Sequence, residues 1–127
     1  PFLFMIIENT SDLIRQWTLL TLSDGSPVAE AELVNGNALV ISPQAIALFR
    51  RPGDCINPLA GGMVRNEAFT DGRILQPPFI EEHRAGFVGL TDGLALLIGL
   101  NDVRMYPNRN DALRNQNMIC ELSLAVD

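Results

Sequence analysis

The segment AEAELVNGNALVIS, residues 29–42, decides the fold of this chain. Its two apolar runs flank Asn35-Gly36, and such a dipeptide tolerates the positive φ angles that a tight two-residue turn requires. The pattern therefore predicts a β-hairpin that bends at this dipeptide.

A second segment of the same design, AGFVGLTDGLALLIG at residues 85–99, has two apolar runs around Asp92-Gly93. Laying Gly36 on Gly93 aligns Leu33–Asp54 with Leu90–Asp111 without a gap. Six of the 22 aligned positions are identical and six more are close replacements, which predicts that the two halves share one structure.

Each half is expected to form a β-meander of three strands, over about 28–54 and 85–111. The predicted strands are 28–34, 38–42 and 45–50 in the first half and 85–90, 94–98 and 102–106 in the second. The third strand of the first half could instead be a helix with Ser42 as its N-cap and Pro43 at its first position. Pro107 stops the aligned stretch of the second half too early for a helix, which favours a strand in both halves.

Local patterns predict further elements. Additional strands are expected at 2–8, 17–22, 73–80 and 119–126. Short helices are expected where Thr10-Ser11 can cap a turn carrying Leu13, Ile14 and Trp17, and where Asn110 can cap DALRNQNM. Residues 51–72 are rich in Gly, Pro, Asn and Asp, which is typical of a long connection, and Gly62–Phe69 could hold a short strand within it.

We therefore expect one domain over residues 1–127, mainly β, arranged as a small barrel or a two-sheet sandwich with one or two short helices. A chain of 127 residues that is 47% apolar can build one hydrophobic core without disulfides. The alternative is an α+β fold, which requires helices at 12–20, 43–51 and 111–118.

Composition excludes several classes of function. Fifteen carboxylates against nine basic residues give a net charge of −6, so we expect no nucleic-acid partner. All nine basic residues are arginine, which excludes a lysine Schiff base and a P-loop that depends on its lysine. The longest apolar stretch, PFLFMII, is far shorter than the roughly 20 residues that span a bilayer, so we expect no membrane partner and a cytoplasmic location.

The two cysteines, Cys55 and Cys120, form no CxxC pair and are predicted to be free thiols. Together with His83 they would supply three ligand types that suit zinc, but none of the short spacings typical of zinc sites. The sequence therefore predicts neither a metal nor a cofactor.

A candidate ligand site comes from the ends of the two meanders. Arg51 and Asp54 follow the last strand of the first meander, and Arg109 and Asp111 follow that of the second. Pseudo-symmetry would place these residues at equivalent ends of the molecule, where they could flank a cleft that binds a small anion. The alternative is that arginine and aspartate bridge the turn within each loop.

His83 is the only histidine, so any catalytic scheme that needs imidazole must use it or borrow one from a second chain. In the segment FIEEHRAG, Glu81 shares its strand face, and Glu82 and Arg84 lie on the other. Nearby carboxylates favour a protonated imidazole, which would suit a proton carrier, and Arg84 could anchor a substrate. The alternative is a solvated charged stretch.

The segment PFLFMIIENTSD, residues 1–12, resembles the start of the tautomerase superfamily, in which an apolar strand begins with a catalytic proline. The resemblance implies Pro1 as general base and arginines that polarise an oxo-acid substrate. It covers about twelve residues. The chain then departs from the family, because the turn cluster Ser23–Pro27 leaves no room for the long helix that the family has next.

Two hypotheses of function follow. The first is a binding or interaction module that forms a homodimer and binds a small anionic molecule, because strands as apolar as FLFMII and LALLIG have few polar positions to face water. The second is a small enzyme, tautomerase-like or hydrolase-like, in which Pro1 or His83 carries a proton and arginine holds the substrate.

Overall fold

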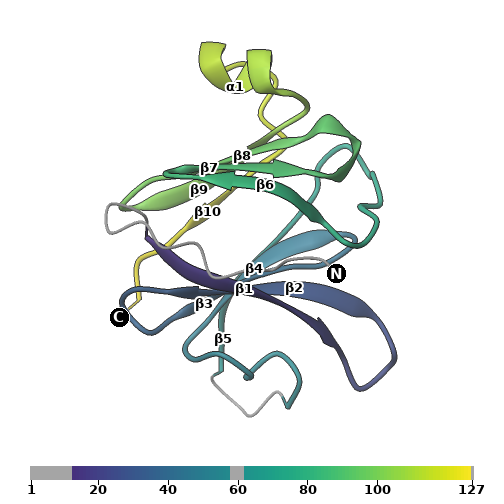
Figure 1. Ribbon diagram of the computed structural model, residues 1–127, viewed down its shortest axis with the longest axis vertical. Coiled ribbons are helices and arrows are strands. Elements are labelled where there is room, and N and C mark those ends of the chain that lie inside the picture. The colour runs from purple at the N-terminus through teal and green to yellow at the C-terminus, as the bar shows by residue number, and fades with distance from the viewer. Residues whose placement is uncertain (1–12, 58–61, 127) are drawn as a thin grey trace.

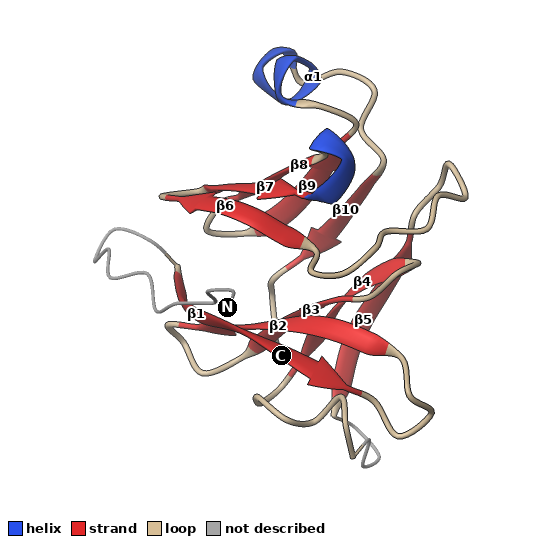
Figure 2. Ribbon diagram, turned by 45° about the vertical axis from the view of Figure 1, so that its right-hand side comes forward, coloured by secondary structure: helices blue, strands red, loops and turns tan. Residues whose placement is uncertain are grey.

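The chain forms two five-stranded antiparallel sheets in this computed structural model, which describes residues 13–57 and 62–126 (Figure 1). Sheet A contains, in spatial order, β1 (Ile14–Thr21), β2 (Pro27–Leu33), β3 (Ala38–Ile41), β4 (Ala45–Phe49) and β5 (Met63–Ala68). Sheet B contains β6 (Ile80–Arg84), β7 (Phe87–Leu90), β8 (Ala95–Ile98), β9 (Asp102–Tyr106) and β10 (Cys120–Ser123). Within each sheet every strand pairs with its neighbours in sequence, and the two sheets lie as two layers of an open sandwich (Figure 2). The predicted mainly-β sandwich is confirmed.

The two sheets repeat one another in the register found in the sequence. With Gly36 laid on Gly93, strand β8 begins and ends where β3 does, and β9 begins and ends where β4 does. The hairpin turns also correspond, because the amide of Leu33 donates to the carbonyl of Asn37 at 2.9 Å and that of Leu90 donates to the carbonyl of Leu94 at 2.8 Å. The similarity of the two meanders is therefore structural.

The two turns use their dipeptides differently. Thr91–Gly93 forms a single 3-10 turn in which Asp92 has a φ of 65° and Gly93 a φ of 80°, as a type I′ hairpin turn requires at both central residues. In the first hairpin, Gly36 has a φ of 93° and its amide donates to the carbonyl of Leu33 at 3.0 Å. Glycine accepts this conformation without a steric penalty.

One hydrophobic core fills the space between the sheets. Inward-facing residues of both sheets belong to it, and among the fully buried ones are Leu39, Ile41, Ile46, Leu48, Leu90, Leu96 and Met105. Leu75 and Phe79, from the connection between β5 and β6, complete it with 1% and 0% exposure. Neither sheet buries its inner face without the other.

Each sheet also has an apolar outer face that the connection after its fourth strand partly covers. On sheet A, Cys55 packs against a cluster that contains Val40. On sheet B, Ala112 of α1 (Arg109–Arg114) packs with Tyr106. The two covering residues correspond to each other, since each directly follows the last aspartate of the aligned segments. Figure 1 shows α1 at one end of the molecule and the first connection at the other, on opposite sides of the sandwich.

The helix expected at 12–20 is wrong, because residues 14–20 of that segment belong to β1. Ile14 and Trp17 are spaced like one helix face, but a β-bulge between Ile14 and Gln16 returns them to the same face of a strand. Both side chains are buried in the core, at 1% and 3% exposure. The expected cap Thr10-Ser11 lies outside the described residues.

The strand expected at 73–80 is also wrong, except for Ile80, which begins β6. This segment carries the chain from sheet A to sheet B. The amide of Leu75 donates to the carbonyl of Pro43 at 2.7 Å, and Phe79 has a φ of 71°, which no strand residue adopts. The apolar residues that suggested a strand instead close the core between the sheets.

The helix expected at 111–118 is α1, which begins earlier because Asn108, not Asn110, caps it: the Asp111 amide donates to the Asn108 Oδ1 at 2.8 Å. The helix expected at 43–51 is β4, so the α+β alternative is wrong. The strand considered within Gly62–Phe69 is β5, the strand predicted at 119–126 contains β10, and the strand expected at 2–8 lies outside the described residues.

Candidate functional site

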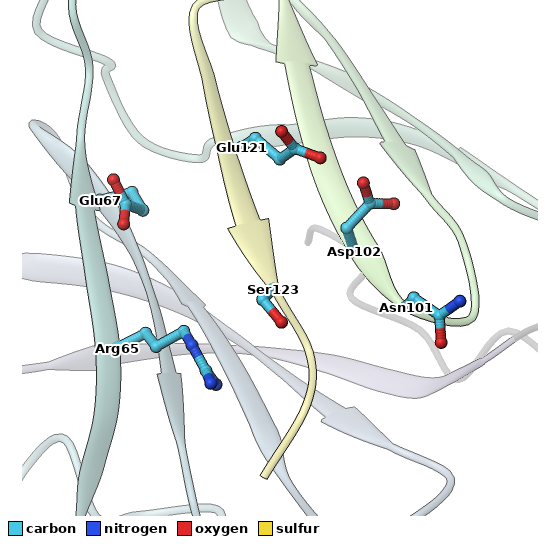
Figure 3. A pocket seen from close by; sticks show the side chains of 6 residues that line it. All are labelled: Arg65, Glu67, Asn101, Asp102, Glu121 and Ser123. Carbon is cyan, nitrogen blue, oxygen red and sulfur yellow. The ribbon is translucent and has the colours of Figure 1, made fainter.

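A cleft of about 470 Å³ opens where β5, at the edge of sheet A, lies beside β9 and β10 of sheet B (Figure 3). Its described lining consists of Arg65, Glu67, Asn101, Asp102, Glu121 and Ser123. All six side chains are polar and three of them are carboxylates. The cleft therefore suits a polar ligand.

Strand alternation places the acidic residues of sheet B. Val103 and Leu122 are fully buried in the core, so their neighbours Asp102 and Glu121 point to the opposite face of the sheet. Glu121 pairs with Arg104 across the β9–β10 ladder, which makes it a diagonal neighbour of Asp102. Figure 3 shows the two carboxyl groups close to each other.

The residues of sheet A reach the cleft because β5 is an edge strand with inward-pointing charges. Arg65 and Glu67 pair with Leu48 and Ile46, which both face the core. Such inward charges discourage another chain from adding to the edge. In this chain the Arg65 guanidinium also donates a hydrogen bond to the carbonyl of Ala125, just after β10.

Asp102 and Glu121 form a pair of neighbouring carboxyl groups on the face of sheet B that points away from the core. The hydrogen bond with Asp102 raises the pKa of Glu121 above its ordinary value of 4.5, partial desolvation and the Asp102 charge raise it further, and Arg104 opposes them. The Arg104 Nε lies 3.8 Å from the Asp102 Oδ2, too far for a hydrogen bond. Arg104 thus neutralises the pair only in part.

The residues predicted to flank an anion-binding cleft lie on opposite outer faces. Arg51 and Asp54 belong to the connection over sheet A, where the Arg51 amide donates to the Asp54 Oδ2 at 3.2 Å. Arg109 and Asp111 belong to α1 over sheet B, where the Asp111 carboxylate accepts hydrogen bonds from Asn108 and Gln116. In both loops the aspartate bonds locally, and the structure does not bring the two pairs together.

Two arginines of the predicted site, Arg84 and Arg109, bind the same carboxylate. Arg84 donates to Glu82 at 2.6 Å and Arg109 donates to the same carboxylate at 2.8 Å, with its guanidinium 4.5 Å from the centre of the Phe87 ring. The hydrogen bond from Arg84, with the two positive charges, holds the pKa of Glu82 below its ordinary value. A carboxylate of the chain itself therefore occupies this pair of arginines.

His83, one of the two candidate proton carriers, does not line this cleft. The His83 ring lies edge-on to Trp17, with ring centroids 6.3 Å apart and planes at 85°. It sits on β6, at the edge of sheet B opposite β10. Pro1 lies outside the described residues. Where the tautomerase resemblance would place a helix, residues 14–33 form the β1–β2 hairpin.

Both cysteines are free thiols, as predicted. Burial raises the pKa of Cys55 to about 11 and that of Cys120 to about 12, with nearby carboxylates contributing. Both thiols therefore stay protonated at neutral pH, which makes them poor nucleophiles. Within residues 13–57 and 62–126, no three or more His, Cys, Asp and Glu side chains are placed to hold a metal ion.

No known family model, curated protein or solved structure matches this chain. In the described part of the chain, no helix has the length and apolar character needed to cross a bilayer.

Sequence reasoning did not single out the residues of the cleft. Asp102 and Glu121 alternate with core residues in the segments NDVRMY and ICELSLAV, so their outward orientation was available from the pattern. Their proximity was not, because it depends on β9 and β10 pairing across the intervening α1. The approach of β5 from the other sheet gives no signal in the sequence.

Proposed function

We propose that this domain binds a small organic cation, such as a protonated amine, in the cleft between β5 and β9–β10. The observation that carries the proposal is the Asp102–Glu121 carboxyl pair on neighbouring strands, in an open cleft that Glu67 also lines. A positive group bound there would relieve the repulsion between the two carboxylates. Ionised carboxylates only accept hydrogen bonds, so they favour a ligand with N–H donors.

The charge and size of the cleft favour this class over the anion that the arginines suggested. Three carboxylates and one arginine line it, and that arginine, Arg65, is engaged with the carbonyl of Ala125. The lack of a metal-holding group within the described residues favours an organic cation over a metal ion. A volume of about 470 Å³ lies within the range of small-molecule pockets, roughly 300–1,000 Å³.

A diamine titration tests the proposal. We expect butane-1,4-diamine to cause saturable shifts in the ¹H–¹⁵N NMR signals of β5, β9 and β10, whereas butane-1,4-diol, which has no charge, causes none. The double variant Asp102→Asn/Glu121→Gln is expected to weaken diamine binding at least about tenfold, because a charge-assisted hydrogen bond contributes roughly 1.5–3 kcal/mol.

The control for net charge is Glu81→Gln/Glu82→Gln, which also removes two negative charges but from β6. This variant should retain the diamine affinity of the natural chain. Equal loss in both double variants would show that the diamine responds only to overall charge, and would overturn the proposal. Absence of saturable binding by the natural chain would overturn it as well.

The titration of Glu121 gives a second prediction. Its pKa lies above the ordinary value, so Glu121 is expected to keep its proton to a higher pH than an ordinary glutamate does. The diamine binds the deprotonated pair, so it should lower the Glu121 pKa, and its affinity should rise with pH through this titration and then level off. Side-chain carboxyl ¹³C shifts measured between pH 3 and pH 8 would show both effects.

Glu82 is the internal reference for that experiment, because its arginine partners lower its pKa and the diamine should leave it unchanged. A Glu121 pKa at or below the ordinary value in the absence of diamine would contradict the interaction between the two carboxyl groups. An affinity that falls as the pH rises would contradict the role of the pair in binding.

The homodimer stays a prediction. Of the two apolar segments that suggested it, LALLIG contains β8, whose inner face lies in the core. Its outer face is covered within the chain, since Ala95 packs with Ala112 of α1. A second copy is therefore not needed to shield this strand. The segment FLFMII lies outside the described residues.

A further inference from the structure

A second cavity, of about 270 Å³, lies on the outer face of sheet A, on the far side of the sheet from the core. Its apolar lining consists of Leu22, Val28, Val40, Ala47, Phe49 and Met63. Four of these residues are buried members of the outer-face cluster, and Met63 is half exposed. The cavity shares no lining residue with the polar cleft.

On sheet B, side chains fill the position that corresponds to this cavity. When the alignment of the two meanders is extended in both directions, Glu30 and Cys55 of sheet A correspond to Phe87 and Ala112 of sheet B. On sheet B, Phe87 and Ala112 pack in one cluster with Tyr106. On sheet A, a carboxylate stands where the aromatic ring would be, and a cavity remains on this face.

Hydrogen bonds hold the wall of this cavity in place. Glu30 is 6% exposed, and its Oε2 accepts a hydrogen bond from the Gly53 amide at 2.9 Å. The Cys55 thiol donates to the same oxygen at 3.6 Å. These bonds tie the connection after β4 to β2, so Cys55 forms a fixed wall of the cavity.

We infer that this cavity is a binding site for a small, uncharged and mostly apolar molecule that carries a single ring. An apolar cavity of roughly 150 Å³ is enough to bind benzene, so 270 Å³ accommodates a substituted ring. None of the described lining residues is an ionised group. The polar groups of Ser42 and Cys55 bond to Ala45 and Glu30, and the Asn66 amide offers one further polar contact. The occupant is therefore a neutral ring compound with one hydroxyl or carbonyl group.

Phenol is the probe that tests this inference on the full 127-residue chain. We expect saturable phenol-induced shifts in the ¹H–¹⁵N NMR signals of β3, β4 and the connection after β4. Ala47→Met should fill the cavity and weaken phenol binding at least tenfold. Met63→Phe, at a half-exposed position that tolerates a larger side chain, should narrow the cavity and weaken binding in the same direction.

Two controls separate this site from the rest of the molecule. Leu113→Phe, on the exposed face of α1, should leave phenol affinity unchanged, and so should Asp102→Asn/Glu121→Gln in the polar cleft. Loss of phenol binding in the cleft variant, undiminished binding in both Ala47→Met and Met63→Phe, or phenol shifts confined to sheet B would each overturn the inference. None of these results bears on the binding of amines.

Discussion

Replacement of Phe79 by alanine is expected to lower the free energy of unfolding by about 3–5 kcal/mol, the usual cost of removing a buried aromatic ring. The ring is fully buried in the core, on the segment that crosses from one sheet to the other. The Phe79 carbonyl accepts a hydrogen bond from the Thr91 amide at 2.8 Å, which ties this crossing to the second hairpin. The substitution therefore leaves a cavity where the sheets join.

The backbone of Phe79 makes this prediction sharper. Its φ of 71° is strained for phenylalanine and for alanine alike, but not for glycine. Phe79→Gly should therefore be no less stable than Phe79→Ala, although it removes one more carbon. Urea denaturation measures both, with Leu100→Ala as the control, since Leu100 is 81% exposed and its loss should change stability by less than about 0.5 kcal/mol. A loss below about 1 kcal/mol in Phe79→Ala would contradict the assigned packing.

The second large effect concerns a pair of equivalent leucines. Leu39→Ala in sheet A and Leu96→Ala in sheet B should each cost about 2–5 kcal/mol. Both side chains are fully buried, both belong to the same core, and they occupy equivalent positions in β3 and β8. We expect costs of similar size because each removes the same atoms from the centre of the same interface.

Trp17, the only tryptophan, reports whether the two sheets unfold together. It lies in sheet A with its ring edge-on to His83 of sheet B, so its fluorescence transition and the circular dichroism transition shift together only if the sheets form one cooperative unit. We expect Leu96→Ala to shift the Trp17 transition and the circular dichroism transition to the same lower urea concentration. A Trp17 transition that stays in place would show that the sheets unfold separately.

Much of the fold was predictable because its contacts are local. Every strand pairs with a neighbour in sequence, so turn signals such as Asn35-Gly36 report directly on the pairing. Strand β1 was harder to recognise, because its bulge gives Ile14 and Trp17 the spacing of a helix face. The segment before Phe79 was wrongly predicted to be a strand, because its apolar residues pack in the core although its backbone does not pair with a sheet.

The sites were less predictable because they depend on contacts between distant segments. The prediction that Glu82 and Arg84 share a strand face was correct, and the two form an ion pair. That Arg109 joins them could not be inferred, since it depends on α1 folding back over sheet B. The polar cleft needs both the β9–β10 pairing and the approach of β5, and the second cavity needs the connection after β4 to lie on the outer face of its own sheet.

The division of the chain into one meander per layer has a consequence for its origin. A polypeptide of half this length, with a single meander, would expose the apolar inner face of its sheet to water. It would need a second identical molecule to bury that face. Duplication and fusion of such a precursor would make that partnership permanent. The outer faces of the two copies could then diverge. One copy could keep a helix over its aromatic side chains, while the other acquired a cavity that can hold a ligand.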